Sequence, residues 1–416
     1  MTVNMKILKL TPHFYWPQLH RSGWPVKFDT IGGMQTQIYR QTEALSKLGI
    51  AHTILTLKVP NTQTIWKMAK NVVVLGVRIP ILPIRSRIRG MVDLNLSWAL
   101  GVLWKLSYLR RNDFSLIHVH CNGVFWPLLL GIFLARFLNK KLIFTIHCSI
   151  LATYEPMNLL DQALFPFARF CERYALRKAE HVIVLTPILQ SFLIKYKYID
   201  SEKLSVVSDT IDVEEFKRKA TPDTIAQVRT QYNIPKDKPV IGYVGRIAHE
   251  KGWTNFVKLA ERLKTEKLHF LVCGDGNERD KLNDLLRRKN LEHCFTVTGY
   301  VSQELIPAIF ANIDLFTLTS IHEEFGGVLI EAMTMEVPVV AFSVGGVPSV
   351  VTHNKTGILL PPGDIKGMEL AVRQLLDNNK LTVKLKKNGL QRVKRKYERK
   401  IVCQKIFDIY KGNITS

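Results

Sequence analysis

The sequence lacks the cysteine spacings that mark zinc sites and redox-active disulfides. It contains six cysteines and no C-x-x-C pair, and that pair is the usual start of either kind of site. Several of the cysteines lie inside apolar runs, where a free cysteine behaves as a small buried hydrophobe. We therefore expect reduced thiols in a cytoplasmic protein. The six are Cys121, Cys148, Cys171, Cys273, Cys294 and Cys403.

Long apolar runs are also missing. A membrane-spanning helix needs about 20 consecutive apolar residues. The most apolar segment, GVFWPLLLGIFLARFL (123–138), is shorter, contains Pro127 and Arg136, and is expected to form a buried helix. The N-terminal residues lack the apolar centre of a signal peptide, and MKIL (5–8) reads as the start of a first strand.

Acidic residues are scarce: 35 stand against 58 lysines and arginines, which gives a formal net charge of +23. Such an excess suits a polyanionic partner, which could be a nucleic acid, an anionic membrane or a nucleotide diphosphate. No nucleic-acid-binding motif is present, so we expect no nucleic-acid partner. The other interpretation is cations spread over solvated faces, and LQRVKRKYERK (390–400) has that pattern.

Familiar nucleotide and metal motifs are absent as well. The sequence has no G-x-G-x-x-G, no Walker loop and no H-E-x-x-H, so neither a dinucleotide site, a P-loop nor a zinc-protease site is indicated. No cluster of carboxylates has metal-ligand spacing, and we expect no metal site.

Two series of near-continuous apolar runs are present, as expected for parallel strands covered on both faces. Helix-length segments separate them; one of these, 33–49, ends at Gly49 as a helix should. The first series is 5–12, 52–58, 71–78, 115–120, 141–147 and 181–186, and the second is 238–246, 268–274, 294–300, 314–320, 337–343 and 357–364.

This organisation predicts an α/β protein with two Rossmann-like, doubly wound domains facing across a cleft. At 416 residues, two domains are also the natural expectation from length. We place an acceptor-side domain at 1–208, a donor-binding domain at 209–392, and at 393–416 a C-terminal helix that packs back on the first domain. Ligands of such sheets bind at the carboxyl ends of the strands.

The stretch HEEFGGVLIEAM (322–333) carries two glutamates, Glu323 and Glu331, on either side of a double glycine. We interpret Glu323 as a loop residue after a strand, Gly326 and Gly327 as the start of a helix, and Glu331 as part of its first turns. A helix N-terminus offers free N–H groups to an anion. The carboxylates suit hydroxyl groups, such as those of a sugar or a ribose.

A second stretch, GRIAHEKG (245–252), places two permanent cations in one loop. Arg246 and Lys251 together suit two phosphates better than one carboxylate. Further glycine turns follow predicted strands at Gly32-Gly33, at 274–276 and at Gly345-Gly346. Glycine turns, two cations and two carboxylates are what a nucleotide-diphosphate sugar requires.

These motifs, together with TIH ending at His147, resemble the retaining, GT-B-fold glycosyltransferases of family 4 over essentially the whole chain. The resemblance implies a retaining transferase that needs no cofactor or metal. It also implies that Arg246 and Lys251 bind the donor diphosphate and that Glu331 binds the ribose.

The resemblance further implies that Glu323 and the residues after it hold the donor sugar, namely Glu324, Phe325, Gly326 and Gly327. His147 lies against the donor sugar and phosphate, and Gly33 lets the first loop approach the diphosphate. His147 and Glu323 are thus the expected catalytic residues, Glu323 orienting the sugar and not acting as a covalent nucleophile. A lone strand-end histidine is more often structural, so His147 depends on the resemblance alone.

The chain departs from the family pattern at three places. Asp209 and Thr210 replace the Asn-Gly of the domain junction, Ser349 follows the second double glycine where a glutamate is usual, and Glu324 stands where a small residue is common. These changes affect the details of the donor pocket.

A narrower resemblance is carried by HCSILATYEPM (147–157), GRIAHEKGW (245–253) and HEEFGGVLIEAM. They are similar to the transferases that build the pseudodisaccharide of 2-deoxystreptamine aminoglycoside antibiotics. This implies UDP-N-acetylglucosamine as donor, 2-deoxystreptamine as acceptor and 2'-N-acetylparomamine as product. The acceptor is a dication that a charge of +23 repels at long range, so an acidic pocket is required; Glu155, Asp161 and Glu323 are candidates.

Alternatives remain open from the sequence. The acceptor could be a membrane lipid or a polysaccharide, because the basic and aromatic segment 83–111 could dock on an anionic bilayer. An amphipathic core helix with a basic rim has the same pattern, so we do not expect peripheral contact with a membrane. Two other functions are alternatives: a glycoside hydrolase that uses the glutamate pair, and a nucleotide-binding module without activity. Both leave more of the motifs unexplained than a glycosyltransferase does.

Overall fold

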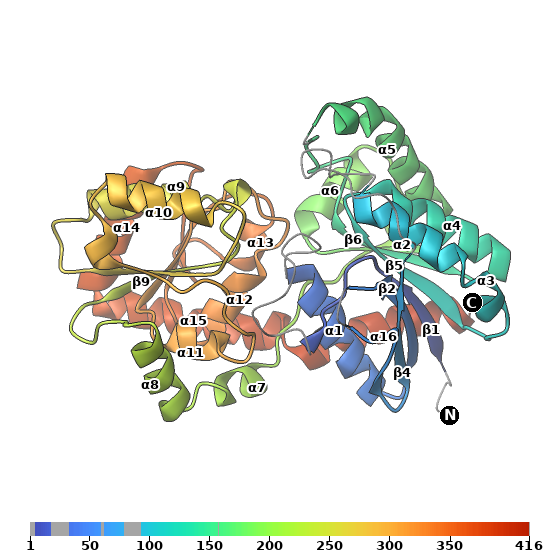
Figure 1. Ribbon diagram of the computed structural model, residues 1–416, viewed down its shortest axis with the longest axis horizontal. Coiled ribbons are helices and arrows are strands. Elements are labelled where there is room, and N and C mark those ends of the chain that lie inside the picture. The colour runs from blue at the N-terminus through green and yellow to red at the C-terminus, as the bar shows by residue number, and fades with distance from the viewer. Residues whose placement is uncertain (1–4, 18–32, 60–61, 79–92, 157, 416) are drawn as a thin grey trace. The chain divides into compact units, whose positions relative to one another are not determined.

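The computed structural model describes residues 5–17, 33–59, 62–78, 93–156 and 158–415. The chain divides into two compact units, and each is an open, mostly parallel sheet with helices on its faces (Figure 1). Unit 1 comprises Met1–Ser208 and Val402–Ser416, and unit 2 comprises Asp209–Ile401. The predicted α/β class with two doubly wound sheets is confirmed.

The sheet of unit 1 contains every strand of the first predicted series. Its order is β3 (Ile65–Ala69), β4 (Val72–Val77), β2 (Ala51–Leu57), β1 (Lys6–Leu10), β5 (Leu116–Asn122), β6 (Leu142–Cys148), β7 (His181–Val184) and β8 (Leu204–Val206). All neighbours pair in parallel except β3 with β4. The sequence analysis missed β3, a half-exposed edge strand, and β8, which has only three residues.

The helices of unit 1 connect these strands. They are α1 (Gly33–Lys47), α2 (Asp93–Leu103), α3 (Leu106–Arg110), α4 (Phe125–Leu138), α5 (Leu159–Lys178), α6 (Pro187–Lys195), the short η3 (Ser201–Lys203) and most of α16 (Arg399–Thr415). The first helix ends as predicted, because Gly49 takes φ +88°, a left-handed conformation that glycine adopts without strain.

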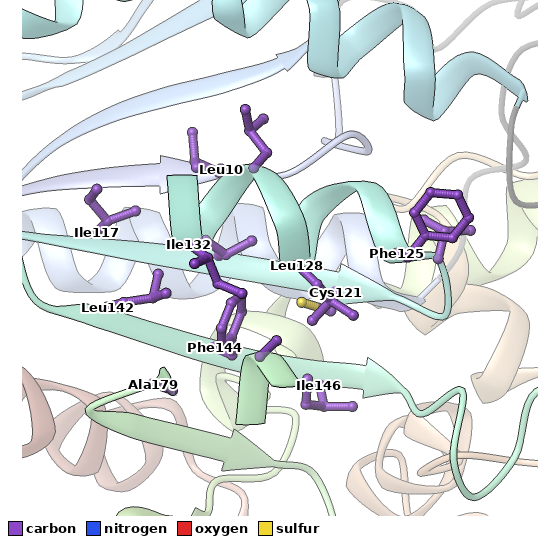
Figure 2. Close-up of a cluster of buried hydrophobic side chains, with 14 of the residues drawn as sticks. Leu10, Ile117, Cys121, Phe125, Leu128, Ile132, Leu142, Phe144, Ile146 and Ala179 are labelled. Atoms are coloured by element: carbon purple, nitrogen blue, oxygen red, sulfur yellow. The ribbon is translucent and has the colours of Figure 1, made fainter. Parts of the chain in front are cut away.

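The apolar segment 123–138 forms α4 (Phe125–Leu138), which packs on β5 and β6, so the predicted helix is confirmed. Burial is confirmed for one face only, because Phe133 and Phe137 are 44% and 40% exposed. Figure 2 shows Leu128 and Ile132 of this helix beside Phe144 and Ile146 of β6. A side chain at Gly131 would clash with Val119 and Phe144 at 2.8 and 3.1 Å, so glycine permits the close approach to the sheet. None of the helices in the described part of the chain has the length and apolar character that crossing a bilayer demands.

The sheet of unit 2 is parallel throughout and contains all six strands of the second predicted series. Its order is β11 (Phe295–Val297), β10 (His269–Cys273), β9 (Val240–Val244), β12 (Leu315–Leu318), β13 (Val339–Phe342) and β14 (Ile358–Leu360). Numbered within the unit, this is the 3-2-1-4-5-6 strand order of a Rossmann sheet. Successive strands are added on one side of β9 up to β11 and on its other side from β12 onward, so the strand order reverses between β9 and β12.

Two helices of unit 2 precede its first strand, and the others follow the strands. In chain order the helices are α7 (Val213–Arg218), α8 (Pro222–Gln231), η4 (His249–Lys251), α9 (Trp253–Arg262), α10 (Arg279–Arg288), η5 (Glu292–Cys294), α11 (Ile306–Ala311), α12 (Gly327–Thr334), α13 (Val347–Val350), α14 (Ile365–Asp377) and α15 (Asn379–Lys396).

The last helix, α16, starts in unit 2 and continues in unit 1. From Val402 onward its apolar face joins a core of unit 1 with Ile7, Leu116 and Ile143. The interpretation of 390–400 as a solvated face is wrong at two residues. Arg399 is 8% exposed and pairs with Glu215 at 3.0 Å, and Arg392 donates to the carbonyl oxygens of Ser349 and Val350.

All six cysteines are free thiols, as the sequence analysis expected. Five are buried, and Cys148 at the end of β6 is half-buried. Burial raises the pKa of Cys273 to about 12, so this thiol stays protonated and unreactive at neutral pH.

Candidate functional site

The predicted donor residues of unit 2 gather at the carboxyl edge of its sheet. Strand β9 leads into Arg246 and η4, and its neighbour β12 leads into the loop 319–326 that carries Glu323. These two strands flank the point where the strand order reverses, which is the preferred ligand position of such a sheet.

Lys251 and Glu323 are bound directly to each other. The Lys251 Nζ atom lies 2.8 and 2.9 Å from the two carboxylate oxygens of Glu323, and Ser320 Oγ donates to Glu323 Oε1 at 2.8 Å. The Glu323 side chain is 8% exposed and that of Lys251 is 25% exposed. The buried carboxylate thus has charge-assisted partners on both oxygens, which is what a buried charge requires.

The backbones of these two loops are also joined. The carbonyl oxygen of Glu250 accepts from the N–H of Ile321 at 2.9 Å, and that of Gly252 accepts from Thr319 Oγ1 at 2.9 Å. Gly252 takes φ +62°, and a Cβ there would stand 1.9 Å from the Thr319 oxygen. Only glycine therefore allows the loop that carries Lys251 to lie this close to the loop that carries Glu323.

The second double glycine holds Glu323 from the other side. Gly346 N–H donates to the Glu323 carbonyl oxygen at 2.8 Å, and a Cβ on Gly345 would stand 1.9 Å from that same oxygen. Gly345 itself takes φ +46°. The motif at 345–346 thus fixes the backbone of Glu323, a role that the sequence analysis did not assign to it.

The helix α12 begins as predicted, with Gly326 at its N-cap in a left-handed conformation (φ +87°) and Glu331 in its second turn. The ring of Phe325 is buried and packs edge-on against Tyr397 at 5.8 Å, so this residue can offer a ligand only its backbone. Glu324 lies beside His322 at 3.4 Å and raises the pKa of that imidazole. Asp209, a departure from the family pattern, stands beside Gly327.

Arg246 is anchored less firmly than Lys251. Its Nη2 atom lies 2.7 Å from Glu250 Oε1, and both side chains are more than a third exposed. Its backbone carbonyl accepts from the hydroxyl of Tyr243 at 2.7 Å. The backbone is therefore fixed while the guanidinium stays accessible, as a phosphate ligand must be.

In unit 1, His147 lies at the end of β6 and is 6% exposed. Its Nε2 atom is 3.0 Å from Nδ1 of His120, which stands at the end of the neighbouring strand β5. Next to them, His118 bonds Tyr410 of α16 through Nδ1 at 2.6 Å and Thr145 through Nε2 at 2.7 Å. Sequence analysis missed His120, although the spacing His118-x-His120 puts both rings on the sheet face that His147 shares.

The proton arrangement of the His120–His147 pair follows from burial. Burial lowers the pKa of His147 to about 3 and that of His120 well below its ordinary value, so both rings are neutral at neutral pH. The Nε2 atom of His120 is buried without a partner among the described residues. A buried lone pair costs less than a buried bare N–H, so His120 carries its proton on Nδ1 and donates to His147. His147 then carries its own proton on Nδ1.

We expect this tautomer to be visible in long-range proton–nitrogen NMR spectra of protein labelled with ¹⁵N-histidine. In His120→Leu the donor is lost, and the His147 signals should shift away from the Nδ1–H pattern; His120→Asn, which can donate from a similar position, should restore it. The remote variant His353→Gln should leave the His147 signals in place. An Nε2–H pattern for His147 in the unaltered protein would contradict the arrangement.

Gly33 begins α1, and a Cβ there would meet no described atom within 4 Å. Gly32 lies outside the described residues. Within those residues, no group of three or more histidine, cysteine, aspartate and glutamate side chains is placed to hold a metal ion.

Two family models match the chain: "Glycosyltransferase Family 4" over residues 31–215 and "Glycosyl transferases group 1" over residues 224–392. A 2-deoxystreptamine N-acetyl-D-glucosaminyltransferase of Niallia circulans is 34% identical over 385 residues, which cover 91% of this chain and 97% of that protein. A 2-deoxystreptamine glucosyltransferase of Streptomyces kanamyceticus is 35% identical over 349 residues, 83% of this chain and 90% of that protein.

Among solved structures, sucrose-phosphate synthase from Thermosynechococcus elongatus superposes with a TM-score of 0.81 at 22% identity, covering 98% of both chains. Two Rossmann-like units of this kind, with a basic and glycine-rich carboxyl edge, define the class of GT-B glycosyltransferases. The chain belongs to glycosyltransferase family 4. It is an enzyme that uses a nucleotide-sugar donor.

Proposed function

We propose that the enzyme transfers N-acetylglucosamine from UDP-N-acetylglucosamine to 2-deoxystreptamine with retention of configuration, giving 2'-N-acetylparomamine. The observation that carries this proposal is the 34% identity to the Niallia circulans enzyme over 97% of its length. In this proposal the acceptor side lies in residues 1–208 and the donor side in residues 209–392.

In the proposed donor site Arg246, Lys251 and the N–H groups at the start of α12 neutralise the diphosphate as the glycosidic bond breaks. Stabilising charge that develops at a leaving group is the largest catalytic effect available to such a site. The ribose hydroxyls bind Glu331. The donor sugar lies against Glu323 and the backbone of 324–327, and its phosphate also meets Gly33.

Glu323 is proposed to orient the sugar and not to attack it. Both of its oxygens already accept bonds from Lys251, and one also accepts from Ser320. A carboxylate held in this way is poorly disposed to form a covalent glycosyl adduct. Trapping such an adduct on Glu323, detected by peptide mass spectrometry, would contradict this role.

His147 is proposed to donate a hydrogen bond from Nδ1 to the donor sugar or its phosphate. A neutral ring with its proton on that atom is a donor and not a base. The departing phosphate, as the resemblance implies, then takes the acceptor proton. His147→Ala should lower kcat by about a hundredfold, and kcat should show no histidine limb between pH 6 and 8.

We rank the three candidates for attracting a cationic acceptor by their exposure and partners. Asp161 is buried in the first turn of α5 and accepts from the Tyr154 hydroxyl at 3.1 Å, and Glu323 is paired with Lys251. Glu155 is exposed. We expect Glu155→Gln to raise the KM for 2-deoxystreptamine by a factor of about 1.5 to 5, as for one surface ion pair, while the KM for the donor stays unchanged. Glu180→Gln, another exposed glutamate of unit 1, is the matched control.

The function is tested by a mass-spectrometric transfer assay. Purified enzyme is mixed with 2-deoxystreptamine and either UDP-N-acetylglucosamine or UDP-glucose, since the two relatives described above differ in the sugar of their names. Product with the first donor supports the full proposal. Product with UDP-glucose alone would support 2-deoxystreptamine as the acceptor and make glucose the transferred sugar. Release of UDP without any pseudodisaccharide would contradict 2-deoxystreptamine as the acceptor.

A lipid or polysaccharide acceptor is the second candidate. It is favoured by the exposed aromatic and basic side chains of unit 1 described below. Transfer of radiolabelled sugar to a total lipid extract, with no transfer to 2-deoxystreptamine, would select it.

A further inference from the structure

Three helices of unit 1 carry aromatic side chains that do not enter the core. On α3, Tyr108 is 38% exposed, and on α4 Phe133 and Phe137 are 44% and 40% exposed. On α5, Phe167 and Phe170 are 48% and 59% exposed. Exposed phenylalanines of this number on adjacent helices are costly for a protein surrounded only by water, because each leaves apolar area hydrated. Such a surface is usually covered by something.

The rings form a connected surface with basic side chains between them, which we name the aromatic–basic strip. Arg110 of α3 lies over the Phe137 ring at 6.0 Å, and Phe137 stacks on Phe133 at 5.9 Å. Arg136 of α4 donates to the Tyr174 hydroxyl of α5 at 3.1 Å, and Tyr174 stacks on Phe170 at 6.2 Å. The strip comprises Arg110, Phe133, Arg136, Phe137, Phe170 and Tyr174.

The exposed charged side chains of α3, α4 and α5 are all positive. The residues of α3, α4 and α5 include six cations, namely Arg110, Arg136, Arg169, Arg173, Arg177 and Lys178. Their acidic residues are Asp161 and Glu172, and each is 1% exposed. Glu172 is turned inward and accepts bonds from Ser149 Oγ at 2.7 Å and from the N–H of Leu151 at 3.1 Å.

We propose that the aromatic–basic strip binds the headgroup region of an anionic phospholipid bilayer. Phenylalanine side chains on surface helices insert at the boundary between headgroups and acyl chains, and tyrosine favours the headgroup level because its ring is apolar and its hydroxyl polar. Arginine side chains bind lipid phosphates, and each cation near an anionic surface strengthens binding about fivefold. A second copy of the chain is a poorer occupant, because it would bring six further cations against the first six.

The strip extends beyond the segment that the sequence suggested. Within 83–111, the described residues 93–111 form α2 and α3. Trp98 of α2 is fully buried, whereas Trp104 and Tyr108 are 81% and 38% exposed. Further exposed rings lie on α4 and α5, which the sequence analysis did not single out as a surface. The strip does not depend on which acceptor the enzyme uses.

Vesicle co-sedimentation of the full-length enzyme tests the proposal. At low salt the enzyme should pellet with vesicles of phosphatidylcholine and phosphatidylglycerol at least about tenfold more strongly than with phosphatidylcholine alone, and salt should weaken the binding. Phe133→Ser/Phe170→Ser and, separately, Arg110→Gln/Arg136→Gln should each lower the partition coefficient at least about tenfold.

Matched controls lie in unit 2. Leu370→Ser/Val383→Ser removes apolar side chains that are 57% and 54% exposed, and Lys384→Gln/Lys387→Gln removes two exposed cations. Both controls should bind vesicles like the unaltered enzyme. Because the strip residues take no part in the proposed donor site, transfer to a soluble acceptor should be unchanged in all four variants.

Two results would overturn the proposal. One is equal binding of anionic vesicles by the strip variants and the unaltered enzyme, or no binding by either. The other is a monomer–dimer equilibrium in analytical ultracentrifugation that the strip variants abolish, which would assign the strip to a second copy. Vesicle binding and oligomeric state are both measured without sugar transfer. A negative result for the strip would therefore leave the proposed function unaffected.

Discussion

Replacing Lys251 with methionine is expected to lower kcat/KM for sugar transfer by about a hundredfold to a thousandfold, the usual loss when one group that stabilises transition-state charge is removed. The same change should lower the free energy of unfolding of unit 2. It leaves the Glu323 carboxylate, which is 8% exposed in its side chain, without its cation. Because Lys251 is itself a quarter exposed, we expect about 1–3 kcal/mol, less than for a fully buried pair.

A double variant separates these two effects. In Lys251→Met/Glu323→Gln the uncompensated charge is gone, so stability should return to within about 1 kcal/mol of the unaltered enzyme, whereas activity should stay low. Urea unfolding and steady-state kinetics measure both quantities. The matched control is Lys289→Met, which breaks an exposed pair with Glu261 and should change neither. If the double variant regained activity as well as stability, Lys251 would have a structural role and no catalytic one.

Mild acid is expected to unfold unit 1 before unit 2. Unit 1 buries four imidazoles, and burial lowers the pKa of each: to about 3 for His147 and well below the ordinary value for the others. In the unfolded chain each titrates near its ordinary 6.5. Below pH 6.5 the unfolded state binds protons that the folded state does not bind, so the free energy of unfolding decreases as the pH falls. The four are His52, His118, His120 and His147.

The effect is large because the four imidazoles act in the same direction. Each lowers the free energy of unfolding by about 1.4 kcal/mol per pH unit once the pH is well below 6.5, which makes roughly 5 kcal/mol per unit in total. That is comparable with the whole stability of a typical domain, about 5–15 kcal/mol. Burial lowers the pKa of Lys9 from 10.5 to about 7, so Lys9 lowers the free energy of unfolding as the pH falls between those two values. Below pH 7 Lys9 is protonated in both states and adds little further dependence on pH.

Unit 2 carries less of this bias among its described residues. Burial lowers the pKa of His269 to about 4, so this one imidazole lowers the free energy of unfolding by about 1.4 kcal/mol per pH unit between pH 6.5 and 4. Glu324 raises the pKa of His322, but the stability gained by protonating His322 is complete once the pH has fallen to 6.5. Below pH 6.5 the loss of stability in unit 2 is therefore about a quarter of that in unit 1. Hydrogen exchange measured by mass spectrometry at pH 7, 6 and 5 should therefore show protection lost first in peptides of β1, β2, β5 and β6.

His52→Leu provides the test of cause. Neither ring nitrogen of His52 has a hydrogen-bond partner among the described residues, and the side chain is 2% exposed. Leucine has nearly the same volume, so the variant should gain about 1–2 kcal/mol by removing an unpaired polar group and should shift the acid midpoint to lower pH. An unchanged midpoint, or simultaneous loss of protection in both units, would show that the imidazoles do not control acid unfolding.

The sequence by itself determined the strand series, because parallel strands covered on both faces must be apolar along their whole length. It failed at β3 and β8, since an exposed edge strand and a three-residue strand carry too little of that pattern. It also determined that Gly326 opens a helix and that Arg246, Lys251, Glu323 and Glu331 belong near one edge, because strand ends of one sheet meet there.

Only the tertiary structure decided which of these residues touch. Lys251 pairs with Glu323, and Gly345 and Gly346 lie against the Glu323 backbone; these contacts join loops that follow different strands. The bond between His120 and His147 joins two neighbouring strands. Periodicity reports which face of an element is apolar, but it does not report how far apart two loops lie. The exposed rings of α4 were missed for a related reason: an apolar helix has the same sequence pattern whether its outer face is covered by protein or exposed to solvent.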